Sequence, residues 1–381
     1  MLCPRSQAVI LLAFIAATST SAVPLRPSES KLPPSAASSN SISPSSNEKH
    51  GSHSTSEVPL SATSAGSSRS SKPTGKPSGT GTASTSTPSG TGNSTSTAAG
   101  SSNGLAALFP LPNPLSNWTT LPGAAGALPL SDATLMPFKE MSGVDHTYAN
   151  APDGKLAIVA KYPQGSYIPT EEPRGGFSFY APGPKSLDFT TARELTFGYS
   201  VMFPTGFQWN KGGKLPGIYG GDNATTATTC SGGRRDPTCF SARLMWRPNG
   251  AGELYTYLPD PSDPTFAANE KICQIPNSEC NPNYGASISR GAFTFCAGNW
   301  TTVSERVKLN TAGQADGELE LFVGGESVIN ATGIIIRDSD EGRMRGIQMQ
   351  TFFGGATADW ASPADQEAYF ADFSVAILAT I

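Results

Sequence analysis

Residues capable of acid–base chemistry gather in the middle of this chain. Lys214, Ser241, Arg243, Tyr255 and Tyr257 lie there, in a protein that has three histidines among 381 residues. Histidine is the usual base at neutral pH. With so few histidines, an amine or a phenol would have to move protons, next to an arginine that can bind an anion.

A predicted β-hairpin carries four of these five residues. Two alternating runs, CFSARLMWR (239–247) and GELYTYLP (252–259), flank the sequence Pro-Asn-Gly-Ala at 248–251. An Asn-Gly pair between two alternating segments is a strong hairpin signal. We expect Arg247 to pair with Glu253 across this loop.

One face of this hairpin is rich in polar side chains. The expected register places Arg243 opposite Tyr257 and Met245 opposite Tyr255. Side chains alternate between the two faces of a strand, so these odd-numbered residues share one face with Ser241. An arginine and two phenols are an unusual core lining, because each needs a polar partner. The face is either an ordinary solvent-exposed surface or the wall of a cleft.

Lys214 precedes the hairpin in a glycine-rich segment, KGGKLPGIYGG (211–221). We expect a loop here, because glycine permits positive φ and lets a ligand approach the backbone closely. The segment lacks the GxxxxGK[ST] order of a phosphate-binding loop. Taken alone, one lysine in such a loop is more often a solvated charge than a catalyst.

Basic residues cluster in this region, although the net charge of the protein is −4. A local positive charge on an acidic domain indicates an anionic ligand bound at one place, with chance clustering as the alternative. Nucleic acid is not expected, because it needs a broad basic stripe. Between positions 211 and 247 the acidic residues are Asp222 and Asp236, and the basic ones are Lys211, Lys214, Arg234, Arg235, Arg243 and Arg247.

Short alternating segments dominate the chain after residue 105. Gly, Pro, Asn and Asp clusters separate them, which predicts a single all-β domain, a β-sandwich or jelly roll. No repeat of fixed period is present, which argues against a propeller or solenoid. A turn of helix is expected near 361–369. Apart from the hairpin, the expected strands are 155–162, 175–182, 194–203, 293–310, 317–325, 333–337, 346–355 and 368–377.

The start of the chain differs in composition from the rest. Residues 1–22 combine an arginine, an apolar run and a small-residue cleavage site, which predicts a signal peptide and a secreted, extracellular protein. The apolar run is too short to span a bilayer, and no later run reaches that length. Residues 23–104 are rich in Ser, Thr, Pro and Gly, which predicts a disordered stalk. The domain is expected at 105–381, as a monomer without membrane attachment.

Secretion favours disulfides and N-linked glycans. Nearest-neighbour pairing would join Cys230 to Cys239 and Cys273 to Cys280, but spacing alone does not choose the connectivity. A metal site is not expected, because no cysteine pair has CxxC spacing and no histidine lies nearby. Five cysteines follow the signal peptide (Cys230, Cys239, Cys273, Cys280 and Cys296), and Asn-x-Ser/Thr sequences begin at Asn93, Asn117, Asn223, Asn299 and Asn330.

Five motifs follow one another along the chain: KGGKLPGIYGG, SARLMWR, ELYTYLP, MQTFFGG and WASPADQEAYF. This order resembles polysaccharide lyase family 14, the alginate and glucuronan lyases of jelly-roll fold, over roughly residues 130–381. The resemblance implies β-elimination on a uronic-acid polymer, without a cofactor. The catalytic residues that it implies are Lys214, Ser241, Arg243, Tyr255 and Tyr257.

β-Elimination needs a cation on the substrate carboxylate, a base for the C5 proton and an acid for the leaving oxygen. Arg243 is the expected carboxylate ligand, because its planar fork matches that group. Burial beside Arg243 should lower the pKa of Lys214, and nearby cations should lower that of a tyrosine toward phenolate. Lys214 or Tyr255 is the expected base and Tyr257 the expected acid. Ser241 would orient a substrate oxygen, and these roles could be exchanged.

Other residues could contact the sugar chain. Tyr219, Gln348 and Gln350 are the expected substrate-binding residues, and the two glutamines share a strand face by the period of two. Trp360 could stack on a sugar ring, although tryptophan more often packs in a core, as expected for Trp246.

Two further readings of the sequence remain. His146 lacks a companion motif, and we expect it to be structural or on the surface. No carboxylate pair with hydrolase geometry can be defended. A non-catalytic binding module for acidic polysaccharides is the alternative function.

Overall fold

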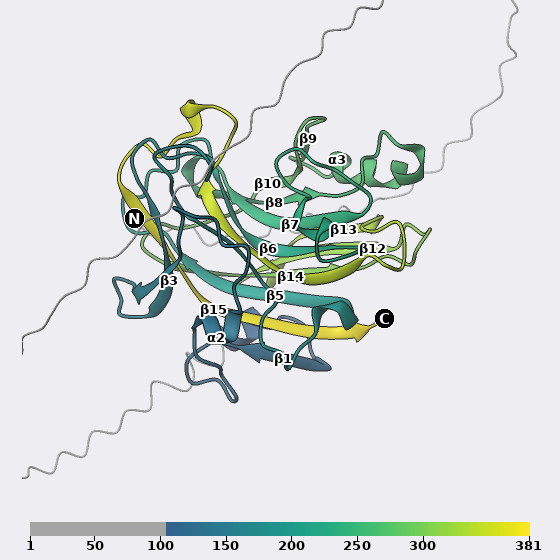
Figure 1. Ribbon diagram of the computed structural model, residues 1–381, viewed down its shortest axis with the longest axis horizontal. Helices are drawn as coiled ribbons and strands as arrows, with labels where there is room; N and C mark the ends of the chain where they lie inside the picture. Colours follow the sequence, from purple (N-terminus) through teal and green to yellow (C-terminus); the bar gives the residue numbers. More distant parts are fainter. Residues whose placement is uncertain (1–103) are drawn as a thin grey trace, which may run out of the picture. The chain divides into compact units, whose positions relative to one another are not determined.

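A computed structural model describes residues 104–381 of the chain (Figure 1). The predicted signal peptide (1–22) and the predicted stalk, apart from residue 104, lie outside the described residues. The described chain forms two antiparallel β-sheets, which confirms the predicted all-β sandwich. Within 104–381, no helix has both the length and the apolar character needed to cross a membrane.

The eight-stranded sheet is built around its two long strands, β5 and β15. They pair with each other, and β15 also pairs with β3 and β1 along different parts of its length. Across the sheet the order is β13 (Glu326–Ile334), β12 (Gly317–Val323), β11 (Trp300–Lys308), β5 (Ala192–Met202), β15 (Gln366–Thr380), β3 (Leu156–Tyr162) and β2 (Thr147–Asn150), with β1 (Ser116–Thr119) on β15.

The seven-stranded sheet carries the predicted hairpin at its centre. Its order is β4 (Phe177–Ala181), β14 (Arg343–Phe353), β6 (Gly213–Gly221), β7 (Cys239–Trp246), β8 (Ala251–Tyr257), β10 (Ala286–Thr294) and β9 (Glu279–Cys280). The helical elements are short: a helical turn at 104–108, α2 (Asp132–Leu135), α3 (Glu270–Gln274), and the 3-10 turns η1 (Phe189–Thr191), η2 (Thr226–Thr228), η3 (Pro248–Gly250), η4 (Pro264–Asn269) and η5 (Ala358–Trp360).

Apolar side chains from both sheets form one core between them. The eight-stranded sheet contributes Phe197, Tyr199 and Phe370, and the seven-stranded sheet contributes Leu244 and Trp246, all fully buried. Burying one such side chain contributes roughly 1.5–3 kcal/mol. The inner face of each sheet therefore holds the sandwich together and fixes the position of its outer face.

The hairpin forms, but its register differs from the predicted one by two residues. Arg243 pairs with Tyr255 rather than with Tyr257. The loop is shorter than expected, because the Arg247 N–H donates to the Ala251 carbonyl and closes the three-residue turn η3. A shift of two residues leaves every side chain on its predicted face. The predicted shared face is therefore present, with a corrected pairing.

Other segments also differ from the sequence expectation, among them β1, β2 and β9, which it did not include. β13 begins at Glu326, well before the expected strand at 333–337. It is an edge strand, and the polar residues that alternate along it do not form the apolar pattern by which strands were predicted. A turn divides the expected strand at 293–310 into β10 and β11. The expected helical turn at 361–369 is absent, because the pairing of β15 with β3 extends to Gln366.

Candidate active site

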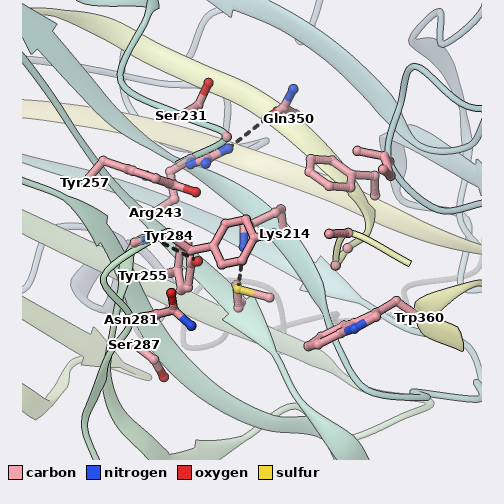
Figure 2. Close-up of a pocket in the computed structure, with 18 of the residues that line it drawn as sticks. Lys214, Ser231, Arg243, Tyr255, Tyr257, Asn281, Tyr284, Ser287, Gln350 and Trp360 are labelled. Atoms are coloured by element: carbon pink, nitrogen blue, oxygen red, sulfur yellow. Dashed lines mark hydrogen bonds between the residues drawn. The ribbon is translucent and has the colours of Figure 1, made fainter. Parts of the chain in front are cut away.

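A cavity of about 720 Å³ lies on the face of the seven-stranded sheet that points away from the core. Strands β6, β7, β8, β10 and β14 contribute residues to its floor, and loop residues contribute its walls. Four of the five predicted catalytic residues line this cavity, and Figure 2 shows them together: Lys214, Arg243, Tyr255 and Tyr257.

The hairpin divides its side chains between the cavity and the core by simple alternation. Arg243 lines the cavity, whereas its neighbour Leu244 is buried in the core. On β8, Tyr255 lines the cavity and Leu254 lies in the core. Core packing therefore fixes the strands from which the polar side chains project, and a site on packed strands is held more rigidly than one on loops.

Lys214 lies on β6, an inner strand of the sheet, and not in the predicted glycine-rich loop. Glycine weakens a strand, but its neighbours here leave no room for a side chain. A Cβ on Gly213 would lie 2.1 Å from the Trp246 ring, and a Cβ on Gly217 would lie 2.1 Å from the Ala242 carbonyl oxygen. The glycines therefore allow close packing of strands and rings rather than close approach of a ligand.

A β-bulge in β6 lets Lys214 face the cavity. The pairing between β6 and β7 shifts by one residue between Leu215 and Gly217. Leu215 and Ile218 both lie in the core, although they are three residues apart. A regular strand would place them on opposite faces. The bulge changes the alternation, so that Lys214 projects outward while the strand keeps its core contacts on both sides.

Two polar side chains from the eight-stranded sheet contact the backbone at this bulge. The Ile218 N–H donates to Glu305 Oε2 at 3.2 Å, and the Tyr199 hydroxyl donates to the Pro216 carbonyl at 3.3 Å. Both side chains are buried in the sandwich. Burial raises the pKa of Glu305 well above its usual range, which favours the protonated carboxyl. The bulged backbone is thus held from the core side by neutral polar groups.

Lys214 is buried next to a sulfur atom, an aromatic ring and two arginines. Its Nζ lies 2.7 Å from Met245 Sδ and 3.5 Å from the centre of the Tyr255 ring. Burial holds the pKa of Lys214 well below its usual range, and the positive charges of Arg243 and Arg247 lower it further. The direction agrees with the sequence prediction. The neutral amine, which can act as a base, is therefore accessible at lower pH than for an exposed lysine.

Arg243 is a buried cation that lacks a carboxylate partner among residues 104–381. Its Nη1 donates to Gln350 Oε1 at 2.7 Å, and its buried Nε has no hydrogen-bond partner within that range. Gln348 Nε2 also donates to Gln350 Oε1, at 3.2 Å. A buried guanidinium without a counter-charge is unfavourable. A bound carboxylate would supply the missing charge.

Tyr255 and Tyr257 stand side by side at the cavity, with ring centres 5.7 Å apart. The Tyr255 hydroxyl accepts a hydrogen bond from the Gly285 N–H at 3.2 Å, and the Tyr257 hydroxyl accepts one from the Gly233 N–H at 3.4 Å. Burial raises the pKa of Tyr255, although Arg243 opposes this shift. The predicted shift toward phenolate is therefore wrong for Tyr255, because lost hydration outweighs the nearby cation.

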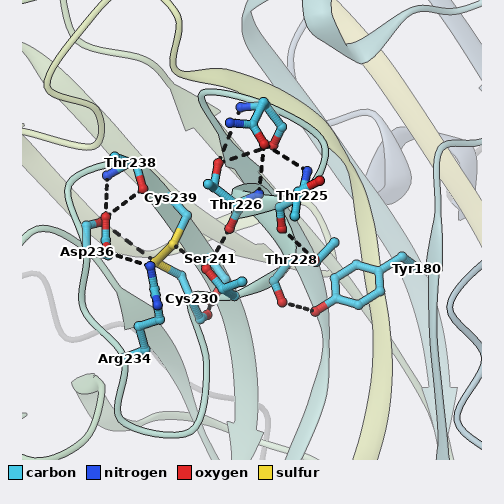
Figure 3. The surroundings of a disulfide bond; sticks show 12 residues. Tyr180, Thr225, Thr226, Thr228, Cys230, Arg234, Asp236, Thr238, Cys239 and Ser241 are labelled. Atoms are coloured by element: carbon cyan, nitrogen blue, oxygen red, sulfur yellow. Dashed lines mark hydrogen bonds and ion pairs between the residues drawn. A yellow bond between two sulfur atoms is a disulfide. The ribbon is translucent and has the colours of Figure 1, made fainter.

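A disulfide fixes the loop between β6 and β7 beside the cavity. Cys230 and Cys239 are bonded, as nearest-neighbour pairing predicts (Figure 3). The Ser241 hydroxyl donates to the Cys230 carbonyl at 2.8 Å. Ser241 is buried and does not line the cavity, so its hydroxyl anchors the loop. The second predicted pair, formed by Cys273 and Cys280, is also bonded.

Gln350 is the one predicted substrate-binding residue of three that lines the cavity. Gln348 is buried behind it, and Tyr219 packs edge-on against Tyr180 with ring centres 4.7 Å apart. Trp360, which the sequence suggests could stack on a sugar ring, also lines the cavity from η5.

Sequence reasoning missed several residues that line the cavity or bind its lining residues. Tyr284, on the loop before β10, is 42% exposed at the cavity wall. Glu253 is fully buried and pairs with Arg247 at 2.6 Å and with Arg290 at 3.1 Å. Arg247 and Glu253 are odd-numbered, so alternation along the hairpin does predict that they share the face of Arg243 and the two tyrosines. No pattern in the sequence marked Tyr284 or Arg290.

His146 lies outside the cavity, between Asp132 at 2.7 Å and Glu140 at 3.4 Å, which fits the structural interpretation. Among residues 104–381, no group of three His, Cys, Asp or Glu residues has the arrangement of a metal site. The asparagines that begin the described Asn-x-Ser/Thr sequences are all exposed: Asn117, Asn223, Asn299 and Asn330.

Similarity to known proteins extends over most of the described domain. Comparison with curated protein sequences gives no significant match. The marine PL-14 alginate lyase from Aplysia kurodai is 28% identical, with a TM-score of 0.59 over 70% of this chain and 99% of that chain. Alginate lyase vAL-1 from Chlorella virus is 29% identical, with a TM-score of 0.51 over 61% of this chain and 89% of that chain. The family model for polysaccharide lyase 14 matches residues 150–373, which is more than half of the sequence. The chain therefore belongs to the polysaccharide lyase 14 family and is a polysaccharide lyase.

Proposed function

We propose that this protein cleaves a polymer of uronic acids by β-elimination in the cavity of the seven-stranded sheet. The observation that carries the proposal is a pair of buried basic side chains with different properties. Burial lowers the pKa of Lys214 and of Arg243, but a guanidinium remains charged in proteins, and Arg243 has an Nε without a partner in the described chain. A polyuronate supplies a carboxylate for the arginine and an acidic C–H proton for the amine. The two similar proteins named above are alginate lyases, and alginate is such a polymer.

In the proposed reaction, Arg243 binds the carboxylate of the sugar that is cleaved. Its charge stabilises the negative charge that develops there as the C5 proton leaves. Lys214 Nζ takes that proton, and the electrons of the C5–H bond form the C4=C5 double bond. The C4–O bond breaks and its electron pair goes to the leaving oxygen, which Tyr257 protonates. Return of the proton from Lys214 to Tyr257 restores both groups.

Lys214 fits the role of base better than Tyr255 does. Burial favours the neutral form of both groups, but a neutral amine accepts a proton whereas a neutral phenol can only give one away. The Tyr257 hydroxyl lies toward Lys214 and Arg243 in Figure 2 and accepts its hydrogen bond from Gly233. Its own proton is therefore available for the leaving oxygen.

We also propose where the enzyme acts and how its chain is divided. We infer secretion after removal of residues 1–22, with 23–104 as a stalk and 105–381 as a monomeric catalytic domain. Two disulfides support this inference, because disulfides persist in oxidising compartments. Alginate and glucuronan both carry the required group, and the substrate is one of these or a related polyuronate.

Ultraviolet absorbance during incubation with alginate, glucuronan or a neutral glucan tests the proposal, because elimination leaves a conjugated unsaturated uronate. We expect absorbance to rise with a polyuronate and not with the glucan. Lys214→Met and Tyr257→Phe should each lower kcat by about 100-fold or more, since general acid–base catalysis contributes about 10²–10⁴-fold.

Lys211→Met is the matched control. Lys211 belongs to the same segment, but it is half exposed, pairs with Asp359 and does not line the cavity. Its replacement should leave kcat unchanged. Binding of a polyuronate without any rise in absorbance would contradict the proposal and indicate a binding module instead.

A further inference from the structure

The cavity contains a second arginine that the proposed reaction does not use. Arg247 lies four residues beyond Arg243 and faces the same side of the hairpin, about 13 Å further along at the usual rise of a strand. Figure 2 shows Gln350, the partner of Arg243, on one side of Lys214 and Trp360 on the other. Arg247 accompanies Trp360, with its guanidinium 5.8 Å from the centre of the ring. The reacting lysine therefore lies between two arginine positions.

Arg247 is held firmly but keeps donor capacity. It is 8% exposed, and its Nη2 donates to Glu253 Oε1 at 2.6 Å. Its Nε is buried and has no hydrogen-bond partner within residues 104–381. A buried donor without an acceptor is unfavourable unless a ligand completes it. The guanidinium is therefore already in place beside the cavity, and one of its donors is unused.

The charges around Arg247 leave an excess of positive charge inside the cavity. Glu253 is shared, because its Oε2 accepts hydrogen bonds from Ser287 at 2.6 Å and from Arg290 at 3.1 Å. The further partner of Arg290 is Glu279, whose side chain is 61% exposed and therefore weakly effective as a counter-charge. Two guanidiniums thus depend on one buried carboxylate, which favours an additional anion beside Arg247.

Trp360 gives this position a surface for a sugar ring. The loop that carries it is packed tightly, since a Cβ on Gly355 would lie 2.2 Å from the indole. The ring lines the cavity next to Arg247. An aromatic face packs against the apolar face of a sugar, while the neighbouring cation binds a charged substituent.

We propose that Arg247 and Trp360 form a second uronate subsite, which binds the carboxylate and ring of the sugar next to the one held by Arg243. This inference rests on the proposed function, because it assigns the same cavity a requirement for two adjacent uronates. The enzyme would then discriminate against chains in which uronates alternate with neutral sugars. Recognition would depend on charge at two positions, whereas the chemistry depends on one.

A polyuronate whose carboxylates have been reduced at random to alcohols, in increasing proportion, tests the inference. When half of the carboxylates remain, only a quarter of adjacent pairs are doubly charged. We expect kcat/KM of the wild-type enzyme to fall with the square of the remaining uronate fraction. For Arg247→Gln we expect it to fall in simple proportion, from a starting value about 10- to 100-fold lower, as for loss of a charged hydrogen bond.

Trp360→Ala keeps the pair between Arg247 and Glu253 and should also lower kcat/KM, with the square dependence retained. Arg234→Gln is the charge-matched control, because Arg234 is half exposed, pairs with Asp236 and does not line the cavity. Thermal unfolding of each variant separates loss of fold from loss of binding.

The outcomes are distinct. Simple proportionality in the wild-type enzyme would overturn the second subsite, and an unchanged kcat/KM in Arg247→Gln would overturn the assignment of this arginine. Failure of the proposed function would instead appear as no cleavage of the unmodified polyuronate by the wild-type enzyme.

Discussion

Glu253 and Glu305 are both hidden from solvent, but their surroundings are opposite. Glu253, on the cavity face of β8, binds two guanidiniums and a hydroxyl. Glu305 points from β11 into the core, where it accepts a hydrogen bond from the Ile218 N–H. Its other oxygen has no partner among the described residues.

The difference shows that the sandwich keeps the ion pairs of Glu253 at the cavity and not in the core between the sheets. A carboxylate between two arginines has positive charges beside it that offset its lost hydration. A carboxyl in the core meets one amide, and burial raises the pKa of Glu305, which favours its protonated form. The cavity face therefore retains charges that a ligand can use. The core face retains a neutral polar group that contacts the bulge of β6.

The largest effect on stability is expected from Glu253→Gln. It leaves Arg247 and Arg290 without their shared counter-charge, and removing one partner of a buried ion pair typically lowers the free energy of unfolding by about 3–5 kcal/mol. Urea denaturation of the variant beside the wild-type protein measures this. A loss below about 1 kcal/mol, as for a surface pair, would remove the contrast with Glu305.

An intermediate effect is expected from Glu305→Leu, which leaves the Ile218 N–H without its acceptor. The free energy of unfolding should fall by about 1–3 kcal/mol. Because the bulge orients Lys214, kcat should fall at least about tenfold while KM stays nearly constant. Urea denaturation and steady-state kinetics give the two values.

Glu305→Gln is the matched control for this change. Glutamine keeps the acceptor and resembles a protonated carboxyl in shape, so stability should change by less than about 0.5 kcal/mol. If glutamine proved as harmful as leucine, Glu305 would have to act through its charge.

The smallest effect is expected in the pH profile. Activity should rise with pH through the lowered pKa of Lys214, because only the neutral amine takes the C5 proton. Arg247→Gln removes a positive charge that lowers this pKa, so the rise should move to higher pH. Glu305→Gln should leave it in place. A profile of kcat/KM against pH for the three proteins decides, and a shift in Glu305→Gln alone would contradict the assignment.

Alternation along the hairpin was enough to predict which residues share the cavity. The register was wrong by two residues, but Arg243 and both tyrosines kept their face, because only an odd shift exchanges the faces of a strand. Ser241 shows the limit of this reasoning. It lies on the predicted strand, but its hydroxyl donates to the Cys230 carbonyl in the loop between β6 and β7.

Other features depend on contacts that local sequence patterns do not reveal. The many glycines of β6 are typical of a loop. In the structure they fit against rings and carbonyls of neighbouring strands, and those neighbours are distant in sequence. The pKa of Tyr255 was predicted in the wrong direction, since charge can be counted along a chain but burial cannot. Tyr284 and Trp360 reach the cavity from loops, whose paths no periodicity describes.

The disulfide between Cys230 and Cys239 makes the structure of the cavity wall depend on the redox conditions in which the chain folds. The loop that it closes meets Ser241 through Cys230 and Tyr257 through Gly233. A chain made where thiols stay reduced should keep both sheets, because the core between them contains neither cysteine. The two cysteines pack instead in a separate buried cluster with Met245, Tyr255 and Tyr257. The wall beside the proposed acid would then lack its covalent tether. Full activity should therefore arise only where the chain folds under oxidising conditions.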